Sequence, residues 1–176
     1  MNIDEIIIRK VKKEDAREWY SLNIRVWRDA YKDIFPPEVF IERENRLDER
    51  VNAFSDETNN NEMVISYLAE YHGEIIGMMH GKLNSGYEYF KNDYADLVAL
   101  YVDMRYQGLG VGGKLKKTFE DWARKKGATK YIIGVLKDNK KARMAYEAWG
   151  GKLINHEEDF VMLEVGYKEV FYEYNL

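Results

Sequence analysis

The stretch LYVDMRYQGLGVGGKL, residues 100–115, joins a predicted strand to a predicted helix through a glycine-rich turn. The apolar run at residues 97–102 predicts a buried strand, and Leu115, Phe119 and Trp122 recur at helical spacing after the turn. Glycine lets the backbone approach a ligand closely, and the first N–H groups of a helix are unpaired and favour an anion. The stretch therefore predicts a site for a phosphorylated ligand. The glycines of the turn are Gly108, Gly110, Gly112 and Gly113.

Two nucleotide-binding motifs match this turn only in part. Gly108, Gly110 and Gly113 satisfy the dinucleotide pattern G-x-G-x-x-G, but the acidic residue expected about 20 positions further on is missing. The nucleoside triphosphate pattern G-x-x-x-x-G-K fits as far as Lys114, but Leu115 stands where a hydroxyl must bind magnesium. Because each motif lacks one required residue, a nucleotide-binding protein is the weaker interpretation of this turn.

A third pattern fits both the turn and a segment downstream. Gln107, Gly110 and Gly112 give Q-x-x-G-x-G, and residues 139–150 give N-x-x-A-x-x-x-Y-x-x-W-G. In this order, with one helix and one strand between them, the two patterns resemble the acetyl-CoA signatures of the GNAT superfamily of N-acetyltransferases. The glycine pattern can also be framed on Arg105, but the frame on Gln107 keeps the usual spacing from the strand end.

The resemblance implies a site for acetyl-CoA as a co-substrate, with no requirement for a metal. The pyrophosphate would sit on the amides of the glycine turn, and the pantetheine arm would bond along the preceding strand. A backbone N–H of that strand would polarise the thioester carbonyl, as in an oxyanion hole. The residues implied in CoA binding are Leu100, Tyr101, Val102, Gln107, Gly108, Leu109, Gly110, Val111, Gly112, Gly113, Asn139, Ala142 and Tyr146.

Tyr146 matches the family position that often protonates the departing CoA thiolate. A phenol has a reference pKa near ~10 and a thiol one near ~8.5, so this proton transfer needs little tuning. Ala142 lies one helical turn before Tyr146 on the same face, which would let the cofactor pass close to the helix. A core tyrosine on an amphipathic helix is the alternative. Asn139 is predicted both to cap this helix and to contact CoA.

The group that takes the proton of the amine is less clearly marked. Asp96 lies on the predicted core strand, and strict alternation puts it on the same face as Leu100. We expect Asp96 to act as the general base through a water molecule, or else to anchor the start of the strand. His80 is the next candidate for the base, and it is also expected to contact the acceptor. Trp27 and Tyr31 resemble aromatic residues that line the acceptor pocket in relatives, although such spacing is more often typical of a core.

Composition narrows the class of protein. The chain has 176 residues, 45% hydrophobic and 33% charged, which predicts one folded domain over residues 1–176. The net charge of -4 argues against a nucleic-acid partner. Cysteine is absent from the sequence, so an acyl-cysteine intermediate is excluded and direct transfer in a ternary complex is expected. With no run long enough for a membrane span and no signal-peptide pattern, we expect a cytoplasmic protein without a membrane partner.

The predicted order of elements indicates an α+β fold with a mixed, mostly antiparallel sheet flanked by helices. This order resembles the GNAT topology. Strands are predicted at residues 5–11, 63–71, 74–83, 94–102, 129–136, 152–155 and 167–174. Helices are predicted at about 16–33, 37–54, 111–127 and 139–149, with a polar loop at 55–62.

The sequence therefore predicts an N-acetyltransferase that moves the acetyl group of acetyl-CoA directly to a primary amine. The alternative is a GNAT-fold module that binds CoA and regulates a partner without catalysis. The acceptor stays open among small molecules, polyamine-like amines and peptide amines. A homodimer is common among members of the family that the chain resembles.

Overall fold

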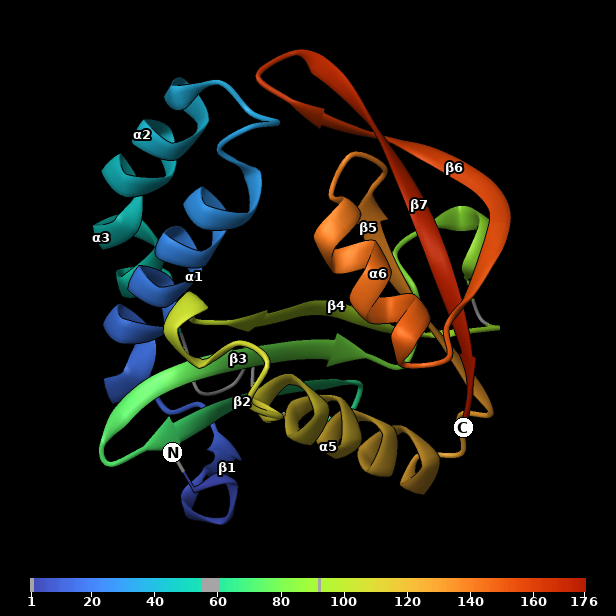
Figure 1. Cartoon of the computed structure of the whole chain (residues 1–176), viewed down its shortest axis with the longest axis horizontal. Coiled ribbons are helices and arrows are strands. Elements are labelled where there is room, and N and C mark those ends of the chain that lie inside the picture. The colour runs from blue at the N-terminus through green and yellow to red at the C-terminus, as the bar shows by residue number, and fades with distance from the viewer. Residues whose placement is uncertain (1, 55–60, 92) are drawn as a thin grey trace.

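The computed structural model describes residues 2–54, 61–91 and 93–176, so most of the predicted polar loop at 55–62 lies outside the described residues. In these residues, seven strands form one sheet in the order β1-β2-β3-β4-β5-β7-β6 (Figure 1). β4 and β5 pair in parallel, and the other neighbouring strands pair antiparallel. The strands are β1 (Ile7–Lys10), β2 (Val64–Tyr71), β3 (Glu74–Lys82), β4 (Ala95–Val102), β5 (Lys130–Leu136), β6 (Lys152–Met162) and β7 (Val165–Asn175). The helices are α1 (Ala16–Tyr31), α2 (Pro37–Asn45), α3 (Leu47–Ala53), α5 (Val111–Lys125) and α6 (Lys140–Ala148).

Helices cover both faces of the sheet (Figure 1). On one face, Leu115 and Phe119 of α5 belong to the largest hydrophobic cluster, and Tyr146 of α6 packs against it. On the opposite face, Trp19 of α1 packs in a second cluster with Leu68 of β2. The predicted α+β fold with a mixed, mostly antiparallel sheet is confirmed. None of the described helices is long and apolar enough to cross a bilayer.

β4 and β5 separate soon after they begin, and this opening is called the split. Their parallel pairing ends at Asp96 and Ile132, whereas β4 runs on to Val102 beside β3. Beyond Asp96, β4 has no paired strand on its other edge among the described residues; Val98 is 46% exposed there, and residues 99–102 are only partly buried. The prediction that residues 97–102 form a buried strand is therefore wrong beyond Leu97.

A register shift in β4 changes the direction of Asp96. His80 of β3 lies opposite Ala99 of β4, and Lys82 lies opposite Asp96. The step from one pair to the next is two residues along β3 but three residues along β4. β4 therefore holds one extra residue between these pairs, a bulge that reverses the alternation of its side chains. Asp96 consequently lies on the face opposite to Leu100, and the prediction that the two share a face is wrong.

Three other boundaries differ from the sequence-based prediction. The predicted second helix is interrupted at Arg46, whose φ of -91° and ψ of 6° separate α2 from α3. β6 and β7 are longer than predicted and form a hairpin whose turn residues, Leu163 and Glu164, have positive φ. The first strand is shorter than predicted, because Ile3–Glu5 forms a 3-10 turn.

Candidate active site

The glycine turn forms the N-terminus of α5 and presents backbone amides to a ligand. Gly108 and Gly110 have φ of 75° and 87°, in the left-handed region that favours glycine, and Gly110 is the N-cap of α5. Within the described structure, the amides of residues 108–113 donate no hydrogen bond to the protein. These amides lie at the positive end of the helix dipole, so the geometry suits a pyrophosphate.

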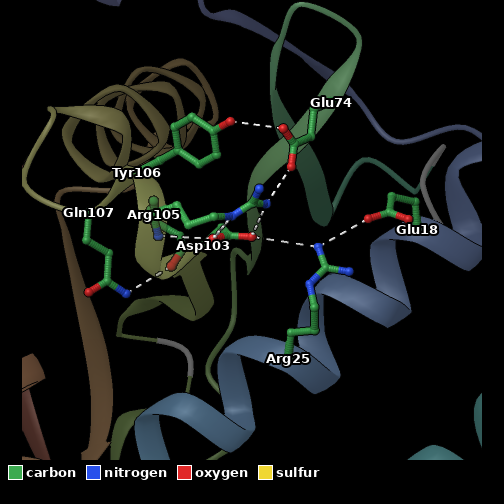
Figure 2. Close-up of polar contacts among 8 residues, drawn as sticks. Glu18, Arg25, Glu74, Asp103, Arg105, Tyr106 and Gln107 are labelled. Carbon is green, nitrogen blue, oxygen red and sulfur yellow. Dashed lines mark hydrogen bonds and ion pairs between the residues drawn. The ribbon is translucent and has the colours of Figure 1, made fainter. Parts of the chain in front are cut away.

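A polar network fixes the start of the turn (Figure 2). Asp103 accepts hydrogen bonds of 2.8 to 3.0 Å from the backbone and guanidinium of Arg105, which also donates to Glu74 of β3. Tyr106 donates to Glu74 at 2.9 Å, and Arg25 of α1 lies 3.8 Å from Asp103. The Arg105 guanidinium lowers the pKa of both carboxylates. Arg105 is therefore committed to two acids, which leaves the backbone amides to receive an anion.

Gln107 bridges the two sides of the split at its mouth. Its Nε2 donates to the carbonyl of Val102 at 2.9 Å, as Figure 2 shows. Its Oε1 accepts from Nζ of Lys141, on α6, at 2.7 Å. An amide and an ammonium group therefore lie beside the glycine turn, where the predicted cofactor would enter.

The free edge of β4 carries hydrogen-bond donors that point into the split. The Asp103 amide donates to the Ile76 carbonyl of β3 at 2.9 Å. Because backbone amides alternate in direction along a strand, those of Leu100 and Val102 point away from β3. This edge can bond a linear amide such as pantetheine, and it offers an N–H to a thioester oxygen.

α6 brings three of the predicted CoA-site residues to the other side of the split. Asn139 caps the helix as predicted, because its Oδ1 accepts from the Ala142 amide at 3.1 Å. Ala142 and Tyr146 pack from α6 against the main core cluster. Burial raises the pKa of Tyr146, and nearby Tyr101 acts in the same direction. Tyr146 is therefore a neutral phenol at neutral pH and can donate a hydrogen bond to a group in the split.

Three tyrosines from separate elements meet at the split. Tyr31 of α1 lies beside Tyr101 of β4 and Asn139. Tyr146 acts to raise the pKa of Tyr31, and Tyr101 acts to raise the pKa of Tyr146, so the three phenols lie close together. Burial is the main cause of the raised pKa of each. Trp27 Nε1 donates to the Tyr101 hydroxyl at 3.0 Å. Trp27 and Tyr31, the predicted acceptor contacts, thus lie beside the strand that would hold the thioester.

Aromatic rings join α1 to the β6–β7 hairpin across the same face. Trp27 contacts Tyr31 with ring centroids 4.9 Å apart and stacks on Phe35 at 5.8 Å. Phe35 in turn contacts Tyr167 at 4.7 Å and Phe160 at 6.1 Å. These rings form an apolar wall on the α1 side. The part played by Phe160 could not be predicted, because the predicted strand stopped at residue 155.

Asp96 and His80 lie on the α1 face, near the point where β4 and β5 part. Asp96 is 2% exposed, accepts from Ser85 Oγ at 3.3 Å and lies 3.8 Å from Lys82 Nζ. Burial raises the pKa of Asp96 to about 6. His80 Nδ1 pairs with Ser66 Oγ at 2.8 Å, and burial lowers the pKa of His80. Both side chains are therefore held by polar neighbours.

Glu169 of β7 is a second buried carboxylate, and the sequence did not reveal it. Tyr87 donates to its Oε2 at 2.7 Å, while Oε1 accepts no bond from the described residues and keeps some contact with solvent. A Cβ at Gly134 would come within 2.7 Å of Oε1, so glycine there makes room for the carboxylate. Burial raises the pKa of Glu169, and the charges of Asp96 and Glu158 act in the same direction. In the sequence, Glu169 alternates with the inward-facing Val170 and Tyr172 and so resembles a residue on the solvent side, but in the structure the segment carrying Tyr87 covers it.

A cleft of about 530 Å³ lies between α1 and the start of the glycine turn. The two arginines of its lining, Arg25 and Arg105, both pair with Asp103. Asp29, the other acidic residue of the lining, has no ion pair within the described structure. The charges of this cleft are largely balanced. The lining residues are Arg25, Val26, Asp29, Asp103, Met104 and Arg105.

Solved structures of other proteins share this fold. The paia N-acetyltransferase from Thermoplasma acidophilum, in complex with coenzyme A, is 22% identical, with a TM-score of 0.71 over 97% of this chain and 99% of that one. Ribosomal-protein-alanine N-acetyltransferase from Brucella melitensis is 18% identical, with a TM-score of 0.71 over 97% and 99% of the two chains. The protein yncA from Salmonella typhimurium, with its cofactor acetyl-CoA, is 17% identical, with a TM-score of 0.66 over 97% and 94%. Identities this low establish the fold alone.

The family itself is established by the sequence match. No curated protein is similar enough to this chain to count as a match. Residues 17–151, which are most of the chain and include the glycine turn and α6, match the model of the Acetyltransferase (GNAT) family. Together with the shared fold, this match shows that the chain belongs to the GNAT acetyltransferase family, whose reaction is acetyl transfer from acetyl-CoA.

Proposed function

We propose that this chain transfers the acetyl group of acetyl-CoA directly to a primary amine, and that residues 1–176 act as one domain in doing so. The split carries the proposal. Unpaired amides of the glycine turn lie at its mouth, and the free edge of β4 and the Tyr146 side chain line its two sides. A thioester along that edge would meet an N–H donor at its oxygen and a phenol near its sulfur. The relative that holds acetyl-CoA supports the same cofactor.

The proposed reaction has one tetrahedral intermediate. The neutral amine attacks the thioester carbonyl carbon, and the oxygen, now negative, accepts a hydrogen bond from an amide of β4 such as that of Leu100 or Val102. Collapse of the intermediate breaks the carbon–sulfur bond and forms the amide product. The Tyr146 hydroxyl donates to the departing sulfur, which leaves as CoA. The proton lost by the amine passes through a water molecule to a carboxylate.

Two buried carboxylates can take that proton. Asp96 is the residue predicted from the sequence, and its carboxylate is held by Ser85 and Lys82. Glu169 is bound at one oxygen by Tyr87, and its other oxygen has no partner among the described residues. We favour Glu169 because its free oxygen can hold a water molecule, with Asp96 as the alternative base.

Acetyl transfer is tested by incubating the purified chain with acetyl-CoA and a panel of primary amines. The expected result is release of CoA thiol that depends on the amine, together with an acetylated product identified by mass. The non-catalytic alternative predicts that CoA binds, as calorimetry would show, with no thiol release above the enzyme-free control for any amine. A melting temperature that rises with ATP or NAD but not with acetyl-CoA would instead favour a nucleotide-binding protein.

Gly110→Ala is expected to weaken acetyl-CoA binding about 10- to 100-fold, which corresponds to losing one or two charge-assisted hydrogen bonds. Gly110 is the N-cap of α5 with φ of 87°, a conformation that strains a residue with a Cβ. Relief of this strain would redirect the amides that receive the pyrophosphate. Isothermal titration calorimetry measures the change in affinity.

Gly127→Ala is the matched control for this substitution. Gly127 follows the other end of α5 with φ of 88°, and an added Cβ there has nothing within 4 Å. Alanine at Gly127 should therefore impose only the cost of the positive φ and leave acetyl-CoA affinity unchanged, whereas a Cβ at Gly110 would also clash with Cδ1 of Ile3, the end of a flexible side chain. Wild-type affinity in a folded Gly110→Ala protein would place the pyrophosphate elsewhere.

A further inference from the structure

Arg43 of α2 is a cation whose hydrogen-bonding capacity is only partly used. Its guanidinium lies over the ring of Trp27, with Cζ 3.7 Å from the centroid, and Nη2 donates to Asn23 Oδ1 at 2.6 Å. Nε is buried without a partner, and it is the one buried side-chain nitrogen or oxygen of the described residues in that condition. Nη1 likewise has no hydrogen bond to a described residue. A buried donor left unpaired is costly, so such a group in a native structure calls for an explanation.

The charge of Arg43 is also uncompensated. Burial lowers the pKa of Arg43 to about 10, and the positive charge of Arg50 acts in the same direction. Tyr101, Tyr31 and Glu42 act in the opposite direction, but together they do not offset the lowering of the pKa of Arg43. Taking an arginine out of water without an acid beside it disfavours the charged form.

Other arginines nearby are paired with acids. Arg28 of α1 lies 2.8 Å from Glu44, and Arg17 lies 2.7 Å from Asp48. Those cations are exposed and need a partner least, whereas Arg43 is half-buried and has no ion pair within the described residues. The structure therefore leaves a negative charge to be supplied at Arg43 from outside the described residues.

Arg43 lies close to the place of the proposed reaction. Trp27, which carries the guanidinium on its ring, donates from its indole nitrogen to the Tyr101 hydroxyl at 3.0 Å. Tyr101 belongs to the free half of β4, along which the thioester would lie. The Trp27 ring and the Tyr101 side chain thus lie between the guanidinium and the strand, so a ligand that reaches both must be several bonds long.

We propose that Arg43 binds a carboxylate of the acceptor, so that the acceptor class is an amine with a carboxylate several bonds from its nitrogen, as in an amino acid whose side chain carries the amine or in a peptide with an acidic residue. This inference rests on the proposed acetyl transfer. A guanidinium suits a carboxylate because its planar donors match the two oxygens, and the pair would neutralise the uncompensated charge. The carboxylate can belong to a free amino acid or to an acidic side chain of a peptide, and the experiment separates these two sources.

The test compares acceptors in matched pairs by kcat/KM for CoA thiol release. Each free amino acid is paired with its carboxamide, and each short peptide with an acidic second residue is paired with its amide counterpart. Wild-type protein should prefer acids over amides by about 10- to 100-fold, the usual value of a hydrogen bond to a charged group. Arg43→Gln keeps a donor for Asn23 but removes the charge, so it should lose this preference while its activity on amides stays unchanged.

Arg50→Gln is the matched control. Arg50 lies over the ring of Tyr20 at 4.4 Å, so this substitution removes a similar contact between a cation and a ring. The control should keep the preference for acids. If Arg43 only braces Trp27, Arg43→Gln should lower the melting temperature and keep the acid-to-amide ratio, and that result would overturn the inference.

The inference and the proposed function fail in different ways. Equal kcat/KM for acids and amides in the wild-type protein would overturn the role of Arg43 and leave acetyl transfer in place. Acetyl-CoA binding without transfer to any amine would refute the proposed function, and this inference with it. If acids are preferred, the better member among free amino acids and peptides identifies the source of the carboxylate.

Discussion

Tyr146→Phe is expected to lower turnover about 10²- to 10⁴-fold, the usual range for loss of a general acid, with little change in acetyl-CoA affinity. The substitution removes only the hydroxyl, and the backbone carbonyl of Tyr146 that accepts from Tyr174 at 2.8 Å is kept. Because burial raises the pKa of Tyr146, its phenol stays protonated across the neutral range. The loss should therefore be the same at every pH between about 6 and 9. Thiol release gives turnover, and calorimetry gives affinity.

Tyr131→Phe serves as the control for removing a tyrosine hydroxyl. Tyr131 of β5 is buried in the core and donates to Glu120 of α5 at 2.7 Å, away from the split. This variant should melt at a lower temperature because Glu120 loses a partner, yet it should turn over nearly as fast as wild type. Wild-type turnover in Tyr146→Phe would make Tyr146 structural and leave departure of the thiolate unassisted.

The cofactor side of the site could be predicted from the sequence because its signals are local. The positive φ of Gly110 depends on the absence of a Cβ, and the cap of α6 depends on Asn139 bonding an amide three residues ahead. The order of strand, turn and helix follows from periodicity within single segments. Each of these features is written in neighbouring residues, so one sequence is enough to locate it.

The acceptor side could not be predicted because its parts meet only through tertiary packing. The bulge that turns Asp96 to the other face depends on how β4 pairs with β3. Glu169 resembles a solvent-side residue of an alternating strand until the segment with Tyr87 covers it. Arg43 resembles one more charge on a charged helix until Trp27 packs beneath it. Burial of a charge is decided by contacts between distant segments, and no local pattern reports it.

The identity of the general base is tested by two substitutions that keep shape and remove a carboxylate. Glu169→Gln is expected to lower kcat/KM about 10²- to 10⁴-fold at the lower end of the pH range. Part of the loss should be recovered as the pH rises, because solvent then deprotonates more of the amine. Wild-type kcat/KM should rise with pH as the base ionises, and burial moves the pKa of Glu169 above its ordinary value. Glu169→Gln should lose this inflection, and Asp96→Asn should keep it.

Stability measurements separate loss of a base from loss of the fold. The pKa of Glu169 is higher in the folded protein than in the unfolded chain. The free energy of unfolding therefore falls as the pH rises from the unfolded pKa to the folded pKa, and the charged carboxylate still destabilises the folded protein at neutral pH. Glutamine carries no charge there, so Glu169→Gln should melt at the same temperature as wild type or higher at neutral pH while turnover falls. The sign is the same for Asp96, whose pKa burial raises to about 6. If Asp96→Asn instead removes an inflection near pH 6 and Glu169→Gln keeps the wild-type profile, then Asp96 is the base, as the sequence predicts.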